Sequence, residues 1–212
     1  MTPFATAREA MVLNQIARRG IADPALLAAF RAVPREDFVA PEFAADAYGD
    51  YPLPIAAGQT ISQPYIVALM IDAAGISGAD RVLEVGAGSG YAAAVLGHVA
   101  ASVVAIERHA EFAAVARERI ARLGLANVTI VEGDGTLGWP DAAPFDAILA
   151  AAGAARVPLP LLDQLRPGGR LVIPLGAPGA VQQLVKLTRN SDGRIACEEL
   201  CPVRFVPLVG AA

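Results

Sequence analysis

Short runs of β-branched and aliphatic residues alternate with helix-like stretches from Arg81 onward, and this alternation most constrains the fold. The runs expected to form strands are Val82–Leu83, Ser102–Ile106, Asn127–Val131, Phe145–Leu149 and Arg170–Ile173. Helical patterns lie between them, at Tyr91–Val99, at His109–Leu123 before Gly124, and at Pro160–Leu165. Strands that alternate with helices are typical of a doubly wound α/β fold, in which the strands are parallel.

The last two apolar segments have a different connection. Val181–Thr188 and Ile195–Leu208 are joined by the turn-forming residues Asn190-Ser191-Asp192-Gly193. Such a cluster favours an antiparallel hairpin rather than a helical crossover. The sequence therefore predicts a seven-stranded, mostly parallel sheet that ends in a carboxy-terminal hairpin.

Two helices are expected before the sheet. Ala5–Arg19 carries apolar residues at helical spacing, and Gly20 follows as a left-handed cap. Asp23-Pro24 supplies a helix cap and a first-turn proline for a second helix that must end before Pro34. Pro34–Pro64 shows no sustained period, and a loop of this length is usually functional. We predict one domain, with residues 1–78 forming helices and this loop and residues 79–212 forming a Rossmann-like core.

Composition excludes several classes of protein. The chain is 55% hydrophobic and 18% charged, which excludes a disordered chain. The uncharged run Tyr51–Ile71 contains three prolines, a glycine and several polar residues, so it does not suit a membrane-spanning helix. The first residues lack the apolar block of a secretory signal, so a cytoplasmic location is expected. The net charge of -4 argues against nucleic acid as a partner.

Cysteine and histidine give no sign of a metal site. Cys197 and Cys201 lack the usual metal-ligand spacing and have no second pair or histidines nearby, so we expect both to be packing residues. His98 and His109 are expected within a helix and at a helix start, and neither lies near a hydroxyl nucleophile in the sequence.

A glycine-rich loop, Glu84–Gly90 (EVGAGSG), follows the first strand of the core and opens a helix. In a doubly wound sheet this is where a nucleotide binds, and the glycines allow the backbone to approach the ligand closely. The dinucleotide fingerprint fails at its third glycine, which is Tyr91 here. Glu84 would repel a phosphate and suits a cationic, amino-bearing ligand such as S-adenosylmethionine. The alternative is a tight strand-to-helix turn without a ligand.

Two further acids follow the next two strands. Glu107 comes 21 residues after Gly86, close to the offset at which an acid accepts ribose hydroxyls. The alternative for Glu107 is an exposed acid that begins a helix. Asp134 lies between Gly133 and Gly135, and we assign it to the exocyclic amine of adenine. The alternative for Asp134 is an Asx-turn.

Hydroxyl and amide side chains cluster in the segment Leu53–Tyr65, just before Pro64 begins a helix. Ser62 is the candidate functional hydroxyl of this segment. Because serine often precedes a helix that starts with proline, Ser62 could equally be the cap of that helix.

Several segments together resemble the protein-L-isoaspartate (D-aspartate) O-methyltransferase family. They are VPREDFV, LPIAAGQTISQPYIVALM, LEVGAGSGY, VVAIER, GDGTLGW, APFDAIL, LLDQLRPGGRLVIPLG and RFVPL, in order along nearly the whole chain. GQTISQP is the most specific of them, because the glycine-rich loop is shared by many methyltransferases. The resemblance implies a Rossmann-like class I methyltransferase that uses S-adenosylmethionine and releases S-adenosyl-L-homocysteine.

The resemblance also implies the roles of individual residues. Ser62 matches the active-site serine, and the loop of Gln59, Thr60, Ile61 and Ser62 covers cofactor and substrate. The implied cofactor positions in the core are Glu84, Gly86, Gly88, Ser89, Gly90, Glu107, Asp134 and Gly135. The implied reaction esterifies the free α-carboxylate of L-isoaspartyl and D-aspartyl residues in damaged proteins. The ester then cyclises to a succinimide, which hydrolyses partly to normal aspartate.

Three departures from the family pattern leave alternatives open. Ala56 stands where glycine is usual, Ala87 where threonine or serine is common, and Ala150 where many members have threonine. Ala56 could restrict the backbone of the loop, and Ala150 removes a hydroxyl where substrate is expected to lie. One alternative is therefore a methyltransferase for a different carboxylate. Others are a nicotinamide-dependent oxidoreductase and a binding module without activity.

Overall fold

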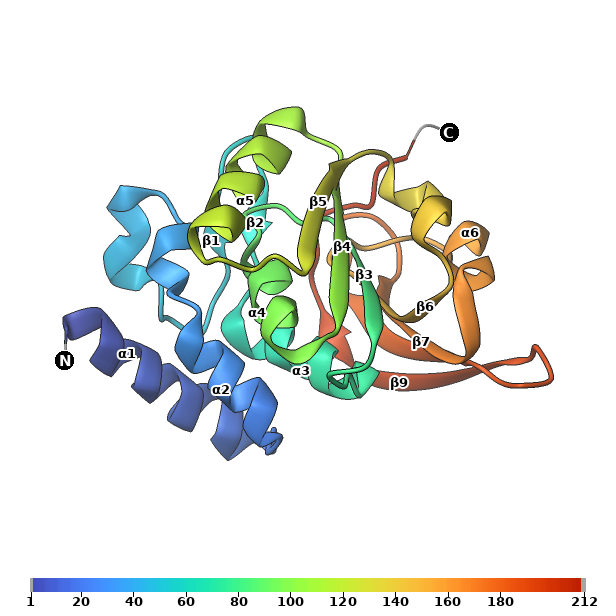
Figure 1. The fold of residues 1–212 in the computed structure, drawn as a ribbon, viewed down its shortest axis with the longest axis horizontal. Coiled ribbons are helices and arrows are strands. Elements are labelled where there is room, and N and C mark those ends of the chain that lie inside the picture. The colour runs from blue at the N-terminus through green and yellow to red at the C-terminus, as the bar shows by residue number, and fades with distance from the viewer. Residues whose placement is uncertain (1, 211–212) are drawn as a thin grey trace.

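A seven-stranded sheet forms the centre of the computed structural model, which describes residues 2–210 (Figure 1). Its strands lie in the order β5-β4-β3-β6-β7-β8-β9. Their bounds are β3 Arg81–Val85, β4 Ser102–Glu107, β5 Val128–Glu132, β6 Phe145–Ala150, β7 Leu165–Leu175, β8 Gln182–Arg189 and β9 Ile195–Val203. Strands β3 to β7 pair in parallel, and β8 and β9 are antiparallel. The predicted seven-stranded sheet with its carboxy-terminal hairpin is confirmed.

The order of the sheet reverses at β3, which lies between β4 and β6. At such a switch point the connections on either side of the strand leave in opposite directions, which opens a crevice beyond the carboxyl ends of the strands. The loop after β3 is the glycine-rich loop, so the fold places this loop at the crevice.

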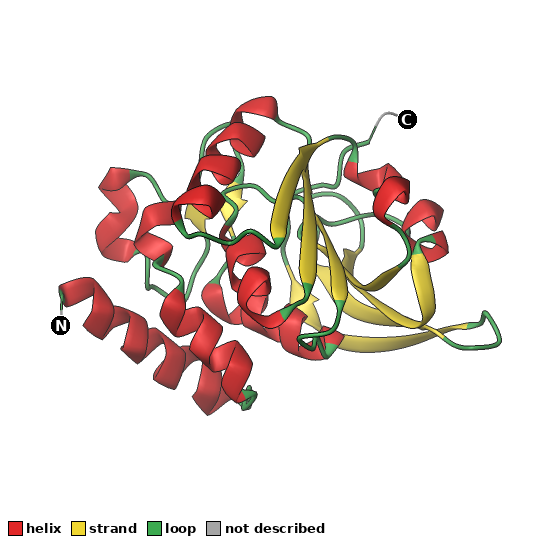
Figure 2. Ribbon diagram, viewed as in Figure 1, coloured by secondary structure: helices red, strands yellow, loops and turns green. Residues whose placement is uncertain are grey.

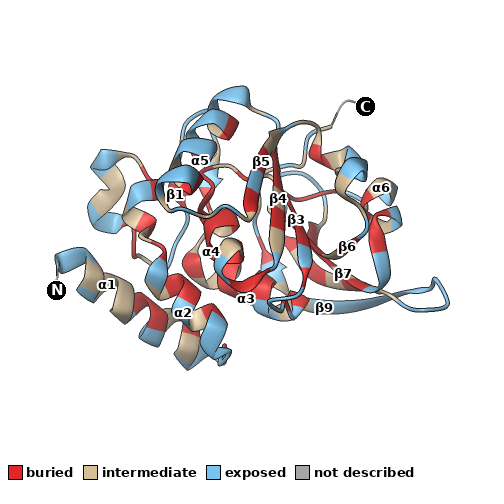
Figure 3. Ribbon diagram, viewed as in Figure 1, coloured by how far each residue is buried: buried red, intermediate tan, exposed pale blue. Residues whose placement is uncertain are grey.

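Helices cover the two faces of the sheet unequally, as Figure 2 shows. On one face α3 (Pro64–Ala74), α4 (Tyr91–Val99) and α5 (Ala110–Arg122) bury apolar residues in the larger core cluster. The other face carries the short α6 (Leu159–Asp163) and two 3-10 turns, η5 (Gly135–Leu137) and η6 (Pro140–Ala142). Most of edge strand β9 is exposed to solvent (Figure 3).

The first predicted helix is continuous but not uniform. It begins as α1 (Pro3–Met11), widens into a π-helical turn, η1 (Val12–Ile16), and tightens into a 3-10 turn, η2 (Ala17–Arg19). Gly20 ends it with a φ of 98°, as predicted. The second helix, α2 (Pro24–Ala32), begins as expected, because the Asp23 carboxylate accepts the Ala25 N–H at 2.8 Å.

The segment before α3 is more ordered than its composition predicts. It contains the 3-10 turns η3 (Arg35–Phe38) and η4 (Pro41–Asp46) and a two-stranded hairpin of β1 (Leu53–Pro54) and β2 (Thr60–Ile61). At the hairpin tip Ala57 and Gly58 have φ values of 54° and 69°. The left-handed alanine is therefore Ala57, so the expectation that Ala56 restricts this loop was placed one residue too early.

The carboxy-terminal segment departs from the prediction. Strand β9 ends at Val203 rather than at Leu208. The chain then crosses the carboxyl ends of the strands, where the Gly153 N–H donates to the Val206 carbonyl at 2.8 Å and the Leu208 N–H donates to the Gly153 carbonyl at 2.7 Å. Beyond Val203, Pro207 forms only an isolated parallel bridge, with Gly153, instead of continuing β9.

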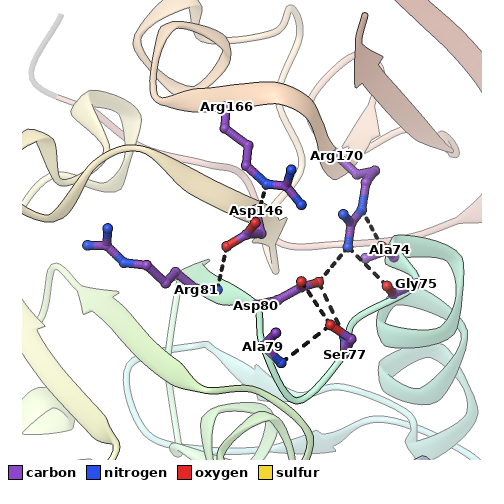
Figure 4. Close-up of polar contacts among 9 residues, drawn as sticks. All are labelled: Ala74, Gly75, Ser77, Ala79, Asp80, Arg81, Asp146, Arg166 and Arg170. Carbon is purple, nitrogen blue, oxygen red and sulfur yellow. Dashed lines mark hydrogen bonds and ion pairs between the residues drawn. The ribbon is translucent and has the colours of Figure 1, made fainter. Parts of the chain in front are cut away.

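A cluster of ion pairs lies at the amino ends of the strands, opposite the glycine-rich loop (Figure 4). The Arg170 guanidinium donates to the carbonyls of Ala74 and Gly75 at 2.6 and 3.0 Å and pairs with Asp80 at 2.7 Å. Burial raises the pKa of Asp80, but hydrogen bonds from Arg170 and Ser77 outweigh this and leave the pKa below its ordinary value. Arg170 thus fixes the end of α3 to β3 and β7.

The two cysteines differ in their surroundings. Cys201 is half-buried against the larger core, as expected of a packing residue, whereas Cys197 is exposed, so the prediction for Cys197 was wrong. Within residues 2–210, no three His, Cys, Asp or Glu side chains gather closely enough to hold a metal ion. None of the helices in that range is long and apolar enough to cross a membrane.

Candidate active site

The glycine-rich loop has a backbone that only glycine adopts readily. Gly86, Gly88 and Gly90 have φ values of 89°, 51° and 85°, all in the left-handed region. At Gly90 a Cβ would also lie 3.1 Å from the Cβ of Ala116 on α5. The alternation of these glycines with Ala87 and Ser89 therefore produces the sharp path from β3 into α4.

Most backbone N–H groups of the loop are already used within the protein. The N–H groups of Gly86 and Ala87 both donate to the Ile106 carbonyl, at 2.9 and 3.0 Å, and the Gly88 N–H donates to Glu107 Oε2 at 2.8 Å. A pyrophosphate needs such donors free at the start of the helix. The loop therefore favours a ligand without phosphate, as its sequence predicts, and disfavours a nicotinamide dinucleotide.

Three adjoining cavities open around this loop, with volumes of about 60, 270 and 450 Å³. The first lies between the glycine-rich loop and helices α3 and α4, and Glu84, Tyr91 and Met70 line it. The second extends past Glu107 and His109. The third opens toward Arg204 and Val181 at the end of the sheet. Because they adjoin, together they reach the size of an ordinary small-molecule site, which is roughly 300–1,000 Å³.

The walls that the cavities share show how the site is divided. Thr60 and Ala151 line all three cavities. Ser62 lines the first and the third, and Gly86 and Gly88 line the first and the second. Ser62 is therefore at the boundary between the cavity beside the glycine-rich loop and the cavity that opens toward Arg204.

Glu84 is a buried acid without a full set of partners. Only 2% of the residue is exposed, and Oε2 of its carboxyl group has no hydrogen-bond partner in the structure. Burial, together with the charge of Glu107, raises the pKa of Glu84 to about 8. A cation bound in the first cavity would give Oε2 a hydrogen-bond partner and would stabilise the ionised form of the Glu84 carboxyl group.

Glu107 is held in place by the loops on either side of it. Its Oε1 accepts the His109 N–H at 2.9 Å and its Oε2 accepts the Gly88 N–H at 2.8 Å. Glu107 is only 5% exposed, so the alternative of an exposed acid at a helix start was wrong. A carboxylate accepts about four hydrogen bonds. Two acceptor positions therefore remain, as many as a ribose diol needs; the ribose role itself stays a prediction.

Asp134, unlike Glu84 and Glu107, lines none of the three cavities. Its Oδ1 accepts the N–H and hydroxyl of Thr136, at 2.9 and 2.7 Å, and so caps η5 as the Asx-turn alternative describes. Asp134 lines a hollow that shares Arg108 and Val209 with the second cavity, and the neighbouring Gly135 lines that cavity. The assignment of Asp134 to the adenine amine stays a prediction.

Ser62 does not cap α3. The cap position is Gln63, and no side chain accepts a hydrogen bond there, so the capping alternative was wrong. Ser62 is half-buried, and its hydroxyl makes none of the hydrogen bonds identified among residues 2–210. The hairpin before it covers the glycine-rich loop, because Ile55 Cδ1 lies 3.7 Å from where a Gly88 Cβ would be.

Comparison with known proteins identifies the family. The model of the protein-L-isoaspartate (D-aspartate) O-methyltransferase family matches residues 6–212. The chain belongs to this family. It is 58% identical to the protein-L-isoaspartate O-methyltransferase of Methylorubrum populi, with the whole of both chains covered. It is 57% identical to protein-L-isoaspartate O-methyltransferase 2 of Pelobacter propionicus, over 96% of this chain and 91% of that protein.

Solved structures agree with this membership. A protein-L-isoaspartate O-methyltransferase of 30% identity superposes with a TM-score of 0.86, over 96% of this chain and 66% of that one. A family member from Plasmodium falciparum, crystallised with S-adenosyl-L-homocysteine, is 26% identical with a TM-score of 0.81, over 95% of this chain and 98% of that one. The predicted Rossmann-like class I methyltransferase fold is confirmed.

Several lining residues of this methyltransferase site were not predicted from the sequence. Ala151 lines all three cavities, whereas Ala150 is fully buried in the core. The expectation that Ala150 lies beside the substrate was therefore wrong by one position. The carboxy-terminal segment from Phe205 to Val209 lines the second and third cavities.

Proposed function

We propose that Ser62 orients the acceptor carboxylate in the methylation of isoaspartyl residues by this chain. Family membership gives the reaction: S-adenosylmethionine-dependent methyl esterification at L-isoaspartyl and D-aspartyl residues. The substrates we propose are proteins and peptides that have been damaged by isoaspartate formation. The observation that carries the role of Ser62 is its position at the boundary of the first and third cavities.

The residues around the first two cavities fit S-adenosylmethionine. The buried Glu84, whose Oε2 lacks a partner, suits the ammonium group of the cofactor. The remaining acceptor positions of Glu107 suit the ribose hydroxyls. Gly86, Gly88 and Gly135 allow close approach of the backbone, and Gln59 and Thr60 of the covering hairpin line the second cavity. When bound, the cofactor supplies an electrophilic methyl group.

We assign the acceptor to the third cavity, because Ser62 lines it and the residues that fit the cofactor surround the first two. The free α-carboxylate of an isoaspartyl residue has an ordinary pKa of about 3.5 and is ionised at neutral pH, so it needs no general base. This agrees with the absence of histidine from the residues that line the first and third cavities. The protein then has to orient the carboxylate and exclude water, and orientation alone is worth about 7 to 11 kcal/mol in well-placed reactions.

Two parts of the chain provide this orientation. The Ser62 hydroxyl donates a hydrogen bond to one oxygen of the acceptor carboxylate and leaves the other oxygen free to react. The β1–β2 hairpin covers the site, because Ile55 packs over Gly88 and Thr60 lines all three cavities. Exclusion of water by a cover of this kind strengthens every electrostatic interaction beneath it.

Replacement of Ser62 with alanine tests the proposal. A hydrogen bond to a charged group is worth about 1.5–3 kcal/mol, so Ser62→Ala is expected to lower kcat/KM for an isoaspartyl peptide by about 10- to 100-fold. The dissociation constant for S-adenosyl-L-homocysteine should change little. Ser191→Ala is the matched control, because Ser191 is exposed in the β8–β9 turn, away from the cavities.

The same assay tests the acceptor. Methyl transfer is compared between an isoaspartyl peptide and the aspartyl peptide of the same sequence, with tritiated cofactor. Labelling of the isoaspartyl peptide alone is expected, and equal labelling of the two would contradict the repair function. Equal kcat/KM for Ser62→Ala and Ser191→Ala would remove Ser62 from the mechanism.

A further inference from the structure

Arg35 is a fully buried cation next to the backbone of Ser62. It begins η3, and none of its surface is exposed. Its Nε donates to the Ala47 carbonyl at 2.7 Å, and its Nη2 donates to the Ser62 carbonyl at 2.8 Å across 27 positions of sequence. The guanidinium group therefore holds the main chain of the proposed catalytic residue directly.

The same guanidinium group contacts the helix that follows the glycine-rich loop. Its Cζ lies 4.7 Å from the centre of the Tyr91 ring, within the range of a cation–π interaction. Tyr91 is the first residue of α4 and lines the first cavity together with Ser62. Phe38, also in η3, packs edge-on against the same ring at 5.4 Å. Arg35 thus connects the Ser62 loop to the element that shapes the cofactor cavity.

Packing alone does not account for a charged residue at this position. None of the ion pairs among residues 2–210 includes Arg35, and Nη1 is buried without a hydrogen-bond partner. Burial of a cation without a carboxylate partner costs stability, and an apolar side chain of similar size usually packs at lower cost. The two carbonyl contacts and the ring contact explain why a planar, forked cation is used here.

We infer that Arg35 is a positioning residue for methyl transfer: by holding the Ser62 carbonyl beside the Tyr91 ring, it directs the Ser62 hydroxyl toward the acceptor. Arg35 lines none of the three cavities, and it acts through Ser62. The inference rests on the proposed role of Ser62. Lysine keeps the charge but is a single point donor, so it cannot hold the Ala47 and Ser62 carbonyls in the same geometry.

A double-mutant cycle with Ser62 separates positioning from stability. We compare kcat/KM for an isoaspartyl peptide in the wild type, Arg35→Lys, Ser62→Ala and the double variant. A small misplacement of a reacting group costs up to about 100-fold, so Arg35→Lys should lower kcat/KM by about 10- to 100-fold, mostly through kcat. In the Ser62→Ala background the same substitution should change kcat/KM by only about twofold.

Arg31→Lys is the matched control. Arg31 pairs with Glu9 at 2.8 Å near the surface, away from the cavities, so this variant should keep the kcat/KM of the wild type. Thermal unfolding is followed for every variant. If Arg35→Lys does not fold, the cycle is run with Arg35→Gln, which is too short to reach both carbonyls.

Each outcome decides the inference. If Arg35→Lys lowers kcat/KM when Ser62 is present but not in the Ser62→Ala background, Arg35 is a positioning residue. Equal losses in the two backgrounds, wild-type kcat/KM in Arg35→Lys, or failure of both Arg35 variants to fold would assign Arg35 to stability alone and overturn the inference. If Ser62→Ala by itself has wild-type kcat/KM, the proposed role of Ser62 fails first, and that single-variant result distinguishes the two failures.

Discussion

Replacement of Glu84 with glutamine should make the cofactor-free protein more stable at neutral pH while weakening cofactor binding. In the folded protein, burial and the charge of Glu107 raise the pKa of Glu84 from 4.5 to about 8. The folded state therefore keeps a proton that the unfolded state releases above pH 4.5. Stability then falls as pH rises through this window, because the folded state binds more protons than the unfolded state.

The size of the effect follows from the shift. Each unit of pKa difference corresponds to about 1.4 kcal/mol, so the 2.5 units between 4.5 and pH 7 amount to a cost of about 3 kcal/mol. The cost reaches about 4 kcal/mol at pH 8, where about half of the folded carboxyl groups are ionised. Glutamine has nearly the same shape and no charge to lose. Glu84→Gln should therefore raise the melting temperature at pH 7 by about 6 to 12 °C in a chain of this size.

Urea denaturation of the cofactor-free protein between pH 5 and pH 8 measures this difference. The unfolding free energies of wild type and variant should nearly coincide at pH 5 and diverge as pH rises. Calorimetry with S-adenosyl-L-homocysteine should show wild-type affinity rising toward pH 8, because the ligand ammonium group requires ionised Glu84. The affinity of the variant should be weaker by about 10- to 100-fold and should not follow this trend. Parallel stability curves, or equal affinities, would refute the reasoning.

Two further substitutions test other parts of the structure. Ala57→Gly removes a left-handed alanine with a φ of 54°, and it should stabilise the protein by about 0.5–1 kcal/mol in urea denaturation; a loss of stability would show that the turn adapts to alanine. Arg170→Met leaves Asp80 buried without its cation, and it should destabilise by about 3–5 kcal/mol in the same assay without changing kcat/KM. The ion pair with Arg170 stabilises the folded protein only where Asp80 is ionised in the unfolded state, which is above its unfolded pKa of 3.8. The loss of unfolding free energy in Arg170→Met should therefore become smaller as pH falls below that value. A loss that does not change with pH would contradict the pairing.

The parts of the fold that the sequence predicted are those with a strong local signal. The parallel strands and the helices between them follow from repeated apolar patterns, and Gly20 and Asp23-Pro24 mark helix ends by their own backbone chemistry. The hairpin of β1 and β2 was missed because two-residue strands are too short to show alternation. The π-helical turn Val12–Ile16 has no local signal and accompanies the packing of its two buried residues, Val12 and Ile16, against the core.

The site residues that the sequence predicted best are acids at the carboxyl ends of strands. Glu84 and Glu107 follow from the glycine-rich loop and the spacing to the next strand, and the structure places both beside the cavities. Arg35 could not be found in this way, because arginine is expected at the surface and its partner Ser62 is 27 positions away. Ala151 carries no polar group at all, so only the three-dimensional arrangement identifies it.

The path of the carboxy-terminal segment bears on how this protein is handled. Val206 and Leu208 are hydrogen-bonded to Gly153, and the ideal Cβ position of Gly210 lies 3.2 Å from Asp134 Oδ2. An affinity tag or a fluorescent reporter fused after this segment would begin beside the second cavity, which Val209 lines. Figure 1 shows the amino end on the opposite side of the molecule, next to α1. Fusions belong at that end, where they leave the walls of the site intact.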